Sequence, residues 1–318
     1  VTVGDIGGLA SILGDDNDLD AGAIGGSLTI DGDENDADVG TVGDGIDIDG
    51  SDNDVTSGAV SVTTAATDGL NVNGDDNNVD VTGGISGTED GVEITGSDNH
   101  VTATATIDGG TNGVIVVGDE NSVSTDADIK GLGGNGVQLD GNENDVAAEG
   151  IYGSAIGADV NGNENTVAAS WIWGDAGQGV DVDGDDNVVT FVNVEAGDDG
   201  VNVNGQDNTL NLEGTDILAE GDGVYINDPS NAFNHDADTR IEAGDDGIEL
   251  GWGGSNDTAN ELFVWAGTID ADDNGFTANA IEDDDSTTLG NWTIHNSGTI
   301  NADVDDNNDG SGILLADN

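Results

Sequence analysis

The stretch Gly-Val-Glu-Ile-Thr-Gly-Ser-Asp-Asn-His-Val, at residues 91–101, recurs in variant form along most of the chain. Its Gly-x-acid-Asn part occurs ten times without a mismatch, and successive asparagines are 18, 18, 24, 22, 22, 23, 21, 22 and 21 residues apart. Self-similarity at such a period is typical of repeat architectures. The ten repeated glycines are Gly14, Gly32, Gly50, Gly74, Gly96, Gly118, Gly141, Gly162, Gly184 and Gly205.

Each repeat has the pattern of short strands joined by tight turns. Val92 and Ile94 alternate with Glu93 and Thr95, and this period of two indicates a strand with one buried face. In the Gly-x-acid-Asn turn that follows, glycine and asparagine tolerate a left-handed backbone. A second strand and a third short strand precede a restart turn, which reads Asp-Gly or Asn-Gly. The restart-turn residues are Asp44, Asp68, Asp90, Asn112, Asn135, Asp199, Asp222 and Asp246.

Strands this short do not form stable isolated hairpins, and no helical period supplies the crossovers of an α/β fold. The pattern predicts an all-β, right-handed parallel β-helix (a solenoid) of about 13 coils, in which each strand stacks on its copy one repeat later. We expect coils mostly of 21–24 residues in a single domain, 1–318. Within it we expect short narrow coils at 1–60, regular coils at 61–230 and longer irregular coils at 231–318.

The repeat resembles the Gly-Ile-x-Ile-x-Gly-x-x-Asn-x-Ile signature of the pectin-lyase-like superfamily of right-handed parallel β-helices. The resemblance runs from about residue 9 to residue 209 and more loosely to the end. It implies the fold, and with the acidic composition it is similar to extracellular adhesin or filament-type repeat proteins. The haemolysin-type Gly-Gly-x-Gly-x-Asp repeat is absent, so the calcium ligands of that family cannot be transferred to this chain.

The 318 residues include 68 Asp and Glu but only Lys130 and Arg240 as basic residues, which gives a formal net charge of −66. Such a charge excludes nucleic acid and anionic membrane as partners and requires cations. The chain has no cysteine, so it has neither a disulfide framework nor thiolate metal sites. No apolar run approaches membrane-spanning length. We therefore expect an extracellular or cell-surface location.

The strongest chemical pattern is the acid before each repeated asparagine. Stacked coils would place these acids in a column with neighbours roughly 4.8 Å apart, so either salt screens a solvated turn or Ca²⁺ bridges adjacent coils. Calcium binds six to eight oxygen ligands from such groups, and we expect several calcium ions. These candidate metal ligands are Asp16, Glu34, Asp52, Asp76, Asp98, Glu120, Glu143, Glu164, Asp186 and Asp207. The neighbouring acids Asp15, Asp33, Asp75, Asp119 and Asp185 are further candidates.

The repeated asparagines are expected to stack their amides as a hydrogen-bonded ladder, because buried turn backbone needs polar partners. The ladder residues are Asn53, Asn77, Asn99, Asn121, Asn144, Asn165, Asn187 and Asn208.

Two aromatic residues, Trp171 and Trp173, lie on one strand face. If that face is the outer one, the two rings form a contact for a carbohydrate or a partner subunit; on the inner face they would fill a wide coil.

An enzymatic alternative comes from Gly-Asp-Asp-Gly at 197–200 and 244–247, which is similar to the Gly-Asp-Asp-Cys-Ile segment of polygalacturonases. That resemblance implies acid–base roles for Asp198, Asp199, Asp245 and Asp246 near Arg240. The companion motifs of that family are missing, so no catalytic residue is assigned. We expect a non-enzymatic, calcium-stabilised extracellular solenoid: a filament subunit, stalk or adhesin. The alternatives are a polysaccharide hydrolase or lyase, and a passive segment of a larger secreted halophilic protein.

Self-association is the last expectation from the sequence. The first three residues read as strand, and residues 311–315 form an apolar strand-like stretch. Unpaired strand edges at the two ends of a solenoid invite pairing with other chains. We therefore expect head-to-tail association of copies of this chain, or continuation of the coil in a longer protein. A surface polymer is a further candidate partner.

Overall fold

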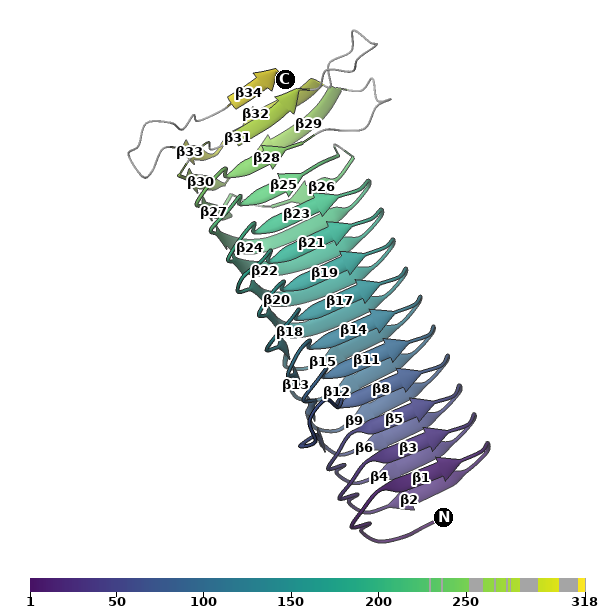
Figure 1. The fold of residues 1–318 in the computed structure, drawn as a ribbon. Coiled ribbons are helices and arrows are strands. Elements are labelled where there is room, and N and C mark those ends of the chain that lie inside the picture. The colour runs from purple at the N-terminus through teal and green to yellow at the C-terminus, as the bar shows by residue number, and fades with distance from the viewer. Residues whose placement is uncertain are drawn as a thin grey trace.

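The computed structural model describes residues 1–228, 230–235, 237–251, 260–265, 267–272, 274, 276–280, 291–302 and 314–317 (Figure 1). These residues form an all-β, parallel β-solenoid of about 11 regular turns, without a helix. The predicted fold class is confirmed, whereas the predicted count of 13 coils is not. Right-handedness stays a prediction. The described part of the chain has no helix with the length and hydropathy needed to cross a membrane.

One face of the solenoid is a sheet of 14 parallel strands that stack in chain order. Each of the ten strands from β1 to β23 lies just before a Gly-x-acid-Asn corner. The strands are β1 (Ala10–Leu13), β3 (Leu28–Asp31), β5 (Ile46–Asp49), β8 (Leu70–Asn73), β11 (Val92–Thr95), β14 (Val114–Val117), β17 (Val137–Asp140), β19 (Ala158–Asn161), β21 (Val180–Asp183), β23 (Val201–Asn204), β25 (Val224–Ile226), β28 (Ile248–Leu250), β31 (Phe276–Ala280) and β34 (Leu314–Asp317). The regular turns end at β25, and β28, β31 and β34 extend the sheet.

The other faces belong to an 18-strand parallel sheet. Its strands are β2 (Asp18–Ala21), β4 (Asp36–Val39), β6 (Asp54–Ser57), β7 (Val60–Ser61), β9 (Asn78–Val81), β10 (Ile85–Ser86), β12 (His100–Ala103), β13 (Ile107–Gly109), β15 (Ser122–Thr125), β16 (Asp128–Gly131), β18 (Asp145–Gly153), β20 (Thr166–Gly174), β22 (Val188–Ala196), β24 (Thr209–Ala219), β26 (Ala232–Asn234), β27 (Arg240–Ala243), β30 (Thr268–Ala271) and β33 (Thr299–Asn301). A two-stranded parallel sheet joins β29 (Asn260–Trp265) to β32 (Asn291–Asn296).

Repeat length sets the width of each coil. In the first, 18-residue coils the third side is a single bridging residue, as in the parallel bridge between Ile24 and Val42. From β7 onward this side gains its own short strands. In the wider coils β18, β20, β22 and β24 run through both the second and the third strand position, and β15 and β16 both pair with β18. The sheet thereby widens in the middle of the solenoid.

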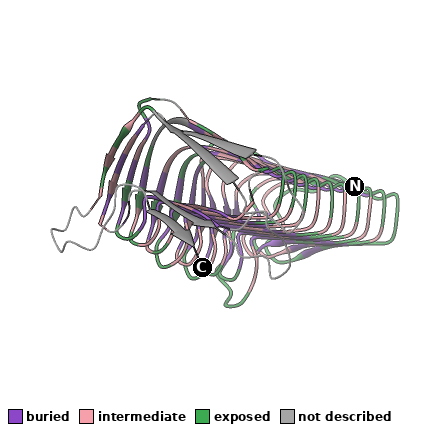
Figure 2. Cartoon of the chain, turned by 90° about the horizontal axis from the view of Figure 1, so that it is seen from above, coloured by how far each residue is buried: buried purple, intermediate pink, exposed green. Residues whose placement is uncertain are grey.

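The core is a set of columns in which each apolar side chain stacks on its counterpart one coil away. Val92 pairs with Leu70 and with Val114 in the 14-strand sheet, and all three are fully buried. Ile107 and Ile129 form the equivalent contact on the third side. Buried and outward residues alternate along most of the strands whose burial is described (Figure 2). Burial is therefore continuous along the axis although each coil contributes few apolar residues.

The coils after β25 are longer, since the register advances by 28 residues from Ile248 in β28 to Phe276 in β31. The apolar stretch predicted at residues 311–315 overlaps β34 (Leu314–Asp317), which pairs with β31. Residues 311–313, including Ile313, lie outside the described residues. The domain boundaries predicted within the chain stay predictions.

Candidate functional site

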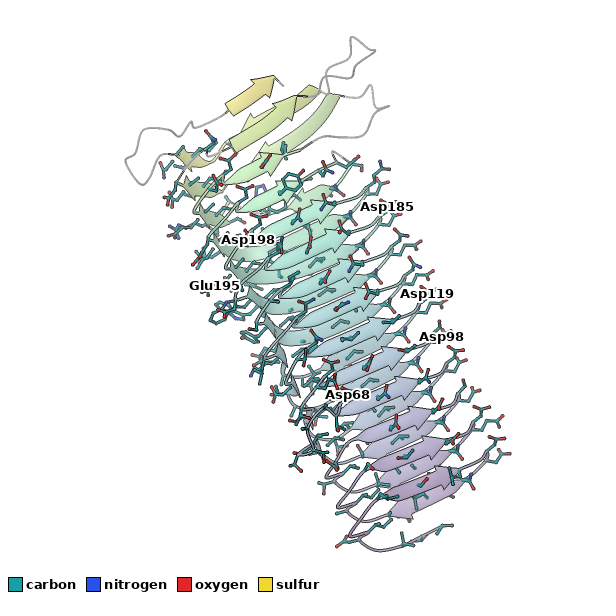
Figure 3. The ribbon with its side chains drawn as sticks, in the orientation of Figure 1. Asp68, Asp98, Asp119, Asp185, Glu195 and Asp198 are labelled. Atoms are coloured by element: carbon teal, nitrogen blue, oxygen red, sulfur yellow. The ribbon has the colours of Figure 1, made fainter. Side chains whose placement is uncertain are left out.

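Two edges of the rod carry the polar residues of the repeat. Asp98, Asp119 and Asp185 follow the edge formed by the Asn-containing corners, and Asp68, Glu195 and Asp198 lie toward the opposite side (Figure 3). The first edge results from the Gly-x-acid-Asn turn, and the second from the restart turn. Each edge therefore holds columns of like residues, one from each coil.

The repeated asparagines form a continuous buried ladder at the first edge. Asn77 donates its backbone N–H and its side-chain amide to Oδ1 of Asn99, and both hydrogen bonds are 3.0 Å long. The same amide also donates to the carbonyl of Gly50, at 2.9 Å. This pattern satisfies corner backbone that water cannot reach. Side-chain amide contacts to the next asparagine or to a corner carbonyl are made by Asn53, Asn77, Asn99, Asn121, Asn144, Asn165, Asn187 and Asn208.

The acid before each asparagine points into solvent. All ten candidate metal ligands of this column, from Asp16 to Asp207, are exposed and have φ between 56° and 60°. This left-handed conformation costs little in glycine and is tolerated by asparagine and aspartate. The charges of Asp98 and Glu143, in the adjacent coils, raise the pKa of Glu120. The column is therefore a line of exposed carboxylates that repel one another.

The neighbouring column of acids has a structural role that sequence reasoning missed. Its carboxylates accept backbone N–H groups from the next coil, as in the contact of Asp33 N–H with Asp15 Oδ1 at 3.0 Å. Asp75 likewise accepts the N–H of Ser97, and Asp119 that of Asn142, both at 2.8 Å. Neutral residues that separate many of these acids lower the repulsion along the column. The alternation of Asp with Ser or Asn in the sequence is the signal that indicates this role.

The restart turn brings acids together in groups of three. Asp68, Asp90 and Glu93 have carboxylate oxygens within 4.8 Å of one another, and so do Asp222, Asp246 and Glu249. In each group two acids come from one Asp-Gly-x-Glu segment and the third from the coil before. Either group could hold a metal ion. None of the ten turn acids belongs to these two groups, which sequence analysis did not single out as metal ligands.

Burial and mutual charge govern protonation in these two groups. Burial, followed by the charges of Asp68 and Asp90, raises the pKa of Glu93. In the second group burial comes first and the adjacent Glu249 adds to it, so that the pKa of Asp222 rises to about 8. A cation bound between the carboxylates would relieve the same cost that a shared proton relieves.

Backbone contacts also occupy the aspartates of the Gly-Asp-Asp-Gly segments. Asp199 accepts the N–H of Asp222 at 2.9 Å, and Asp246 accepts both the N–H and the amide of Asn274 at 2.9 Å. Both residues thus belong to a second ladder, which consists of contacts between the restart turns of successive coils. Asp198 and Asp245 precede them in their turns, and burial raises the pKa of Asp245.

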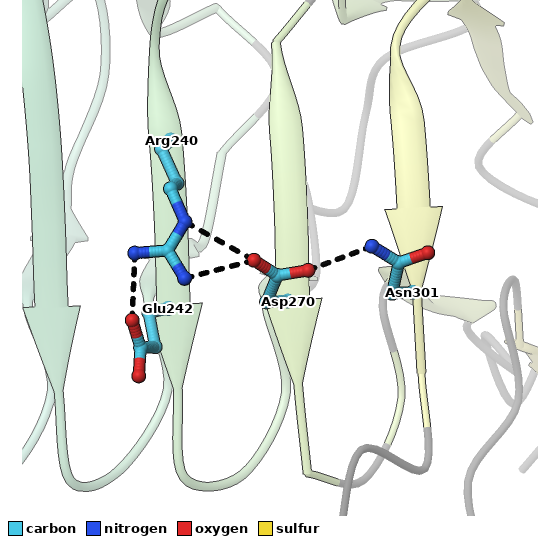
Figure 4. A network of polar contacts seen from close by, with 4 residues as sticks. All are labelled: Arg240, Glu242, Asp270 and Asn301. Carbon is cyan, nitrogen blue, oxygen red and sulfur yellow. Dashed lines mark hydrogen bonds and ion pairs between the residues drawn. The ribbon is translucent and has the colours of Figure 1, made fainter.

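Arg240 is held between carboxylates of its own and the next coil (Figure 4). Its Nε and Nη2 donate to Asp270 Oδ2 at 3.1 and 2.9 Å, and its Nη1 lies 2.7 Å from Glu242. Asp270 also accepts the amide of Asn301 at 2.7 Å. These contacts, together with Glu220 and Asp272, border a surface hollow of about 680 Å³. Arg240 therefore tethers successive coils.

Trp171 and Trp173 lie on the outer face, 52 % and 40 % exposed, whereas Ile172 between them is buried.

Comparisons with protein-family models, with curated protein sequences and with solved structures found no match for this chain. The resemblance to the pectin-lyase-like superfamily is therefore supported as a parallel β-solenoid and not as family membership.

Proposed function

We propose that this chain is a structural β-solenoid, stabilised by calcium, in an extracellular or cell-surface stalk, filament subunit or adhesin. The observation that carries the proposal is the pair of three-acid groups. Each group contains acids from two consecutive coils, and their carboxylate oxygens lie within 4.8 Å of one another. The chain supplies almost no positive charge to offset them. A bound cation would then act as a clamp between coils.

Calcium suits these groups better than smaller cations. It accepts six to eight oxygen ligands in flexible geometry, whereas Mg²⁺ demands a near-ideal octahedron and dehydrates reluctantly. Asp68, Asp90 and Glu93 each offer one carboxylate oxygen to a shared ion, so water would complete the coordination shell. The exposed turn acids would add weaker binding, because each lies on a different coil and faces solvent.

A structural role also fits what the polar residues do. The two ladders and the ion pair between Arg240 and Asp270 connect coil to coil along the described part of the rod. A parallel solenoid has two different ends, so association of copies through their strand edges would be head to tail and would give an open filament. Sedimentation velocity over a range of concentrations in calcium measures this association, and a sedimentation coefficient independent of concentration would contradict it.

Thermal unfolding followed by circular dichroism tests the calcium clamp. We expect a higher midpoint in millimolar Ca²⁺ than in chelator, with little effect of equal Mg²⁺. Combining Glu93→Gln with Glu249→Gln should remove most of the gain, whereas Asp216→Asn, an exposed acid outside both groups, should keep it. A midpoint unchanged by calcium would refute the clamp. Equal rescue by molar monovalent salt would instead indicate general charge screening, as in halophilic proteins.

A polysaccharide hydrolase or lyase is the alternative, and the acid-lined hollow beside Arg240 is the observation in its favour. Assays on acidic and neutral polysaccharides with wild type and with Asp272→Asn, an acid of the hollow outside both three-acid groups, test it. If wild type turns over a polysaccharide and this substitution abolishes the turnover, the enzymatic proposal replaces the structural one. An inactive chain that is still stabilised by calcium would support the structural proposal.

A further inference from the structure

The outer side of β16, β18, β20 and β22 carries an ordered group of aromatic rings, which we call the aromatic face. The pairing of these strands places Lys130, Tyr152, Trp173 and Glu195 in one row along the rod. A second row, two residues earlier in each strand, contains Asp128, Gly150, Trp171 and Asn193. Adjacent members of a row are about 4.8 Å apart, the spacing of neighbouring strands. The rigid sheet fixes where each ring is attached.

The two tryptophan rings are exposed, and the Tyr152 ring is half-buried. The ring centroids of Tyr152 and Trp173 are 6.2 Å apart with their planes tilted by 59°, so neither ring covers the other face to face. A Cβ added at Gly150 would lie only 2.7 Å from the Tyr152 ring. The tyrosine ring therefore occupies the space that a side chain at position 150 would take. This buried glycine therefore leaves room for the Tyr152 ring to pack over position 150.

Polar groups border the rings on both sides. Lys130 Nζ lies 5.7 Å from the centre of the Tyr152 ring and 3.0 Å from Asp128. Asn193 and Glu195 follow Trp171 and Trp173 in the next coil. The border thus offers an ammonium, an amide and carboxylate oxygens, all suited to hydroxyl groups.

From this arrangement we propose that the aromatic face binds an uncharged polysaccharide. A sugar ring has an apolar face of C–H groups that can lie on an aromatic ring, and hydroxyl groups at its rim that the polar border can bind. The net charge of −66 opposes binding of an anionic polymer. Within the two rows, however, the only charges are Asp128, Glu195 and Lys130, so an uncharged ligand meets little local field.

A basic protein segment is the competing occupant, and two observations disfavour it. Lys130 already places a cation near the Tyr152 ring and already pairs with Asp128. The apolar part of the face consists of three rings, whereas a stable protein interface buries roughly 800 Å² on each partner. The proposal does not depend on calcium, so it can fail while the calcium clamp holds.

Affinity electrophoresis and tryptophan fluorescence with soluble neutral polysaccharides (a β-glucan, a mannan and a galactan) test the proposal on the folded chain. We expect at least one to bind, with longer oligosaccharides binding more tightly than monosaccharides. Trp171→Ala and Trp173→Ala should each weaken binding roughly three- to tenfold, the range of one aromatic contact. Trp173→Phe should recover part of the loss.

Leu13→Ala is the matched control, because Leu13 is an exposed apolar residue (71 %) on β1, far along the rod. It should leave binding unchanged, and circular dichroism should show all variants folded. Three outcomes would overturn the proposal: no neutral polysaccharide binds, the double tryptophan variant binds as wild type does, or the tryptophans are needed only for an arginine-containing peptide. Stronger, tryptophan-dependent binding of polygalacturonate would overturn its restriction to uncharged polymers.

Discussion

The backbone N–H and the side-chain amide of Asn77 both donate to the same acceptor, Oδ1 of Asn99 one coil later, at 3.0 Å in each case. Both asparagines are buried, so the acceptor cannot be replaced by water without rearrangement. Asn99 in turn donates its amide to Asn121 and to the carbonyl of Gly74. The side chain of Asn99 therefore links its own coil to the coil before it and to the coil after it.

Replacing Asn99 by alanine should be strongly destabilising. The substitution leaves buried donors of Asn77 unpaired, and each such group costs about 1–3 kcal/mol. We expect a loss of about 2–5 kcal/mol in the free energy of unfolding, measured by chemical denaturation. The control is Asn78→Ala, because Asn78 makes an exposed bond to Asp54, and it should cost less than about 1 kcal/mol. Equal effects of the two substitutions would contradict a buried ladder.

The corner glycines are needed for close approach as well as for their dihedral angles. Gly118 has φ of 136°, and a Cβ there would lie 2.0 Å from the carbonyl oxygen of Gly96. Gly118→Ala should therefore cost about 3 kcal/mol or more, because both strain and overlap must be relieved. Gly7→Ala, at a position with nothing within 4 Å of the added Cβ, should be nearly neutral. Denaturation midpoints of the two variants make the comparison.

The stacking of the coils was predictable from the sequence because the repeat itself fixes the register. Val92 pairs with Val114 at the spacing that separates the successive corner asparagines. The aromatic row was predictable in principle, since Tyr152 and Trp173 each stand immediately before a glycine and those glycines pair. The pattern within one strand indicates only Trp171 and Trp173, because Tyr152 lies on β18, in the coil before theirs.

The three-acid groups were not predictable in this way. Glu93 points outward from a strand, whereas Asp90 and Asp68 belong to the restart edge, and the angle of the corner brings them together. Periodicity assigns residues to columns but does not give the angle between neighbouring columns. The functional meaning of the exposed turn acids is likewise not contained in their spacing, which suits solvated and calcium-bridged corners equally well.

Repulsion along the turn-acid column gives a third prediction. Glu120→Asn removes one charge between Asp98 and Glu143 and introduces a residue that tolerates the left-handed conformation. We expect a higher melting midpoint at about 0.01 M salt and a smaller gain at about 1 M, where charges are screened within a few ångströms. Glu120→Ala removes the same charge but disfavours this backbone, so its gain should be smaller or negative. A salt-independent effect would contradict repulsion as the cause.

The last prediction concerns pH and links the second acidic group to calcium. The pKa of Asp222 is raised from 3.8 to about 8 in the folded chain. The folded state therefore keeps a proton that the unfolded state loses, and the contribution of Asp222 to stability falls as pH rises from about 4 to about 8. In chelator, wild type should lose stability relative to Asp222→Asn across this window. In millimolar calcium the difference should shrink or reverse, because the cation takes the place of the proton.

Asp181→Asn is the control for this experiment. Burial, together with Asp183 and Asp159, raises the pKa of Asp181 to about 6, but this residue belongs to neither three-acid group. Its removal should therefore change the pH dependence in the same direction between about pH 4 and 6, with no added sensitivity to calcium. Chemical denaturation from pH 4 to 9, with chelator and with calcium, separates the two cases. If calcium shifts the profiles of both variants equally, the ion acts by general screening and Asp222 is not one of its ligands.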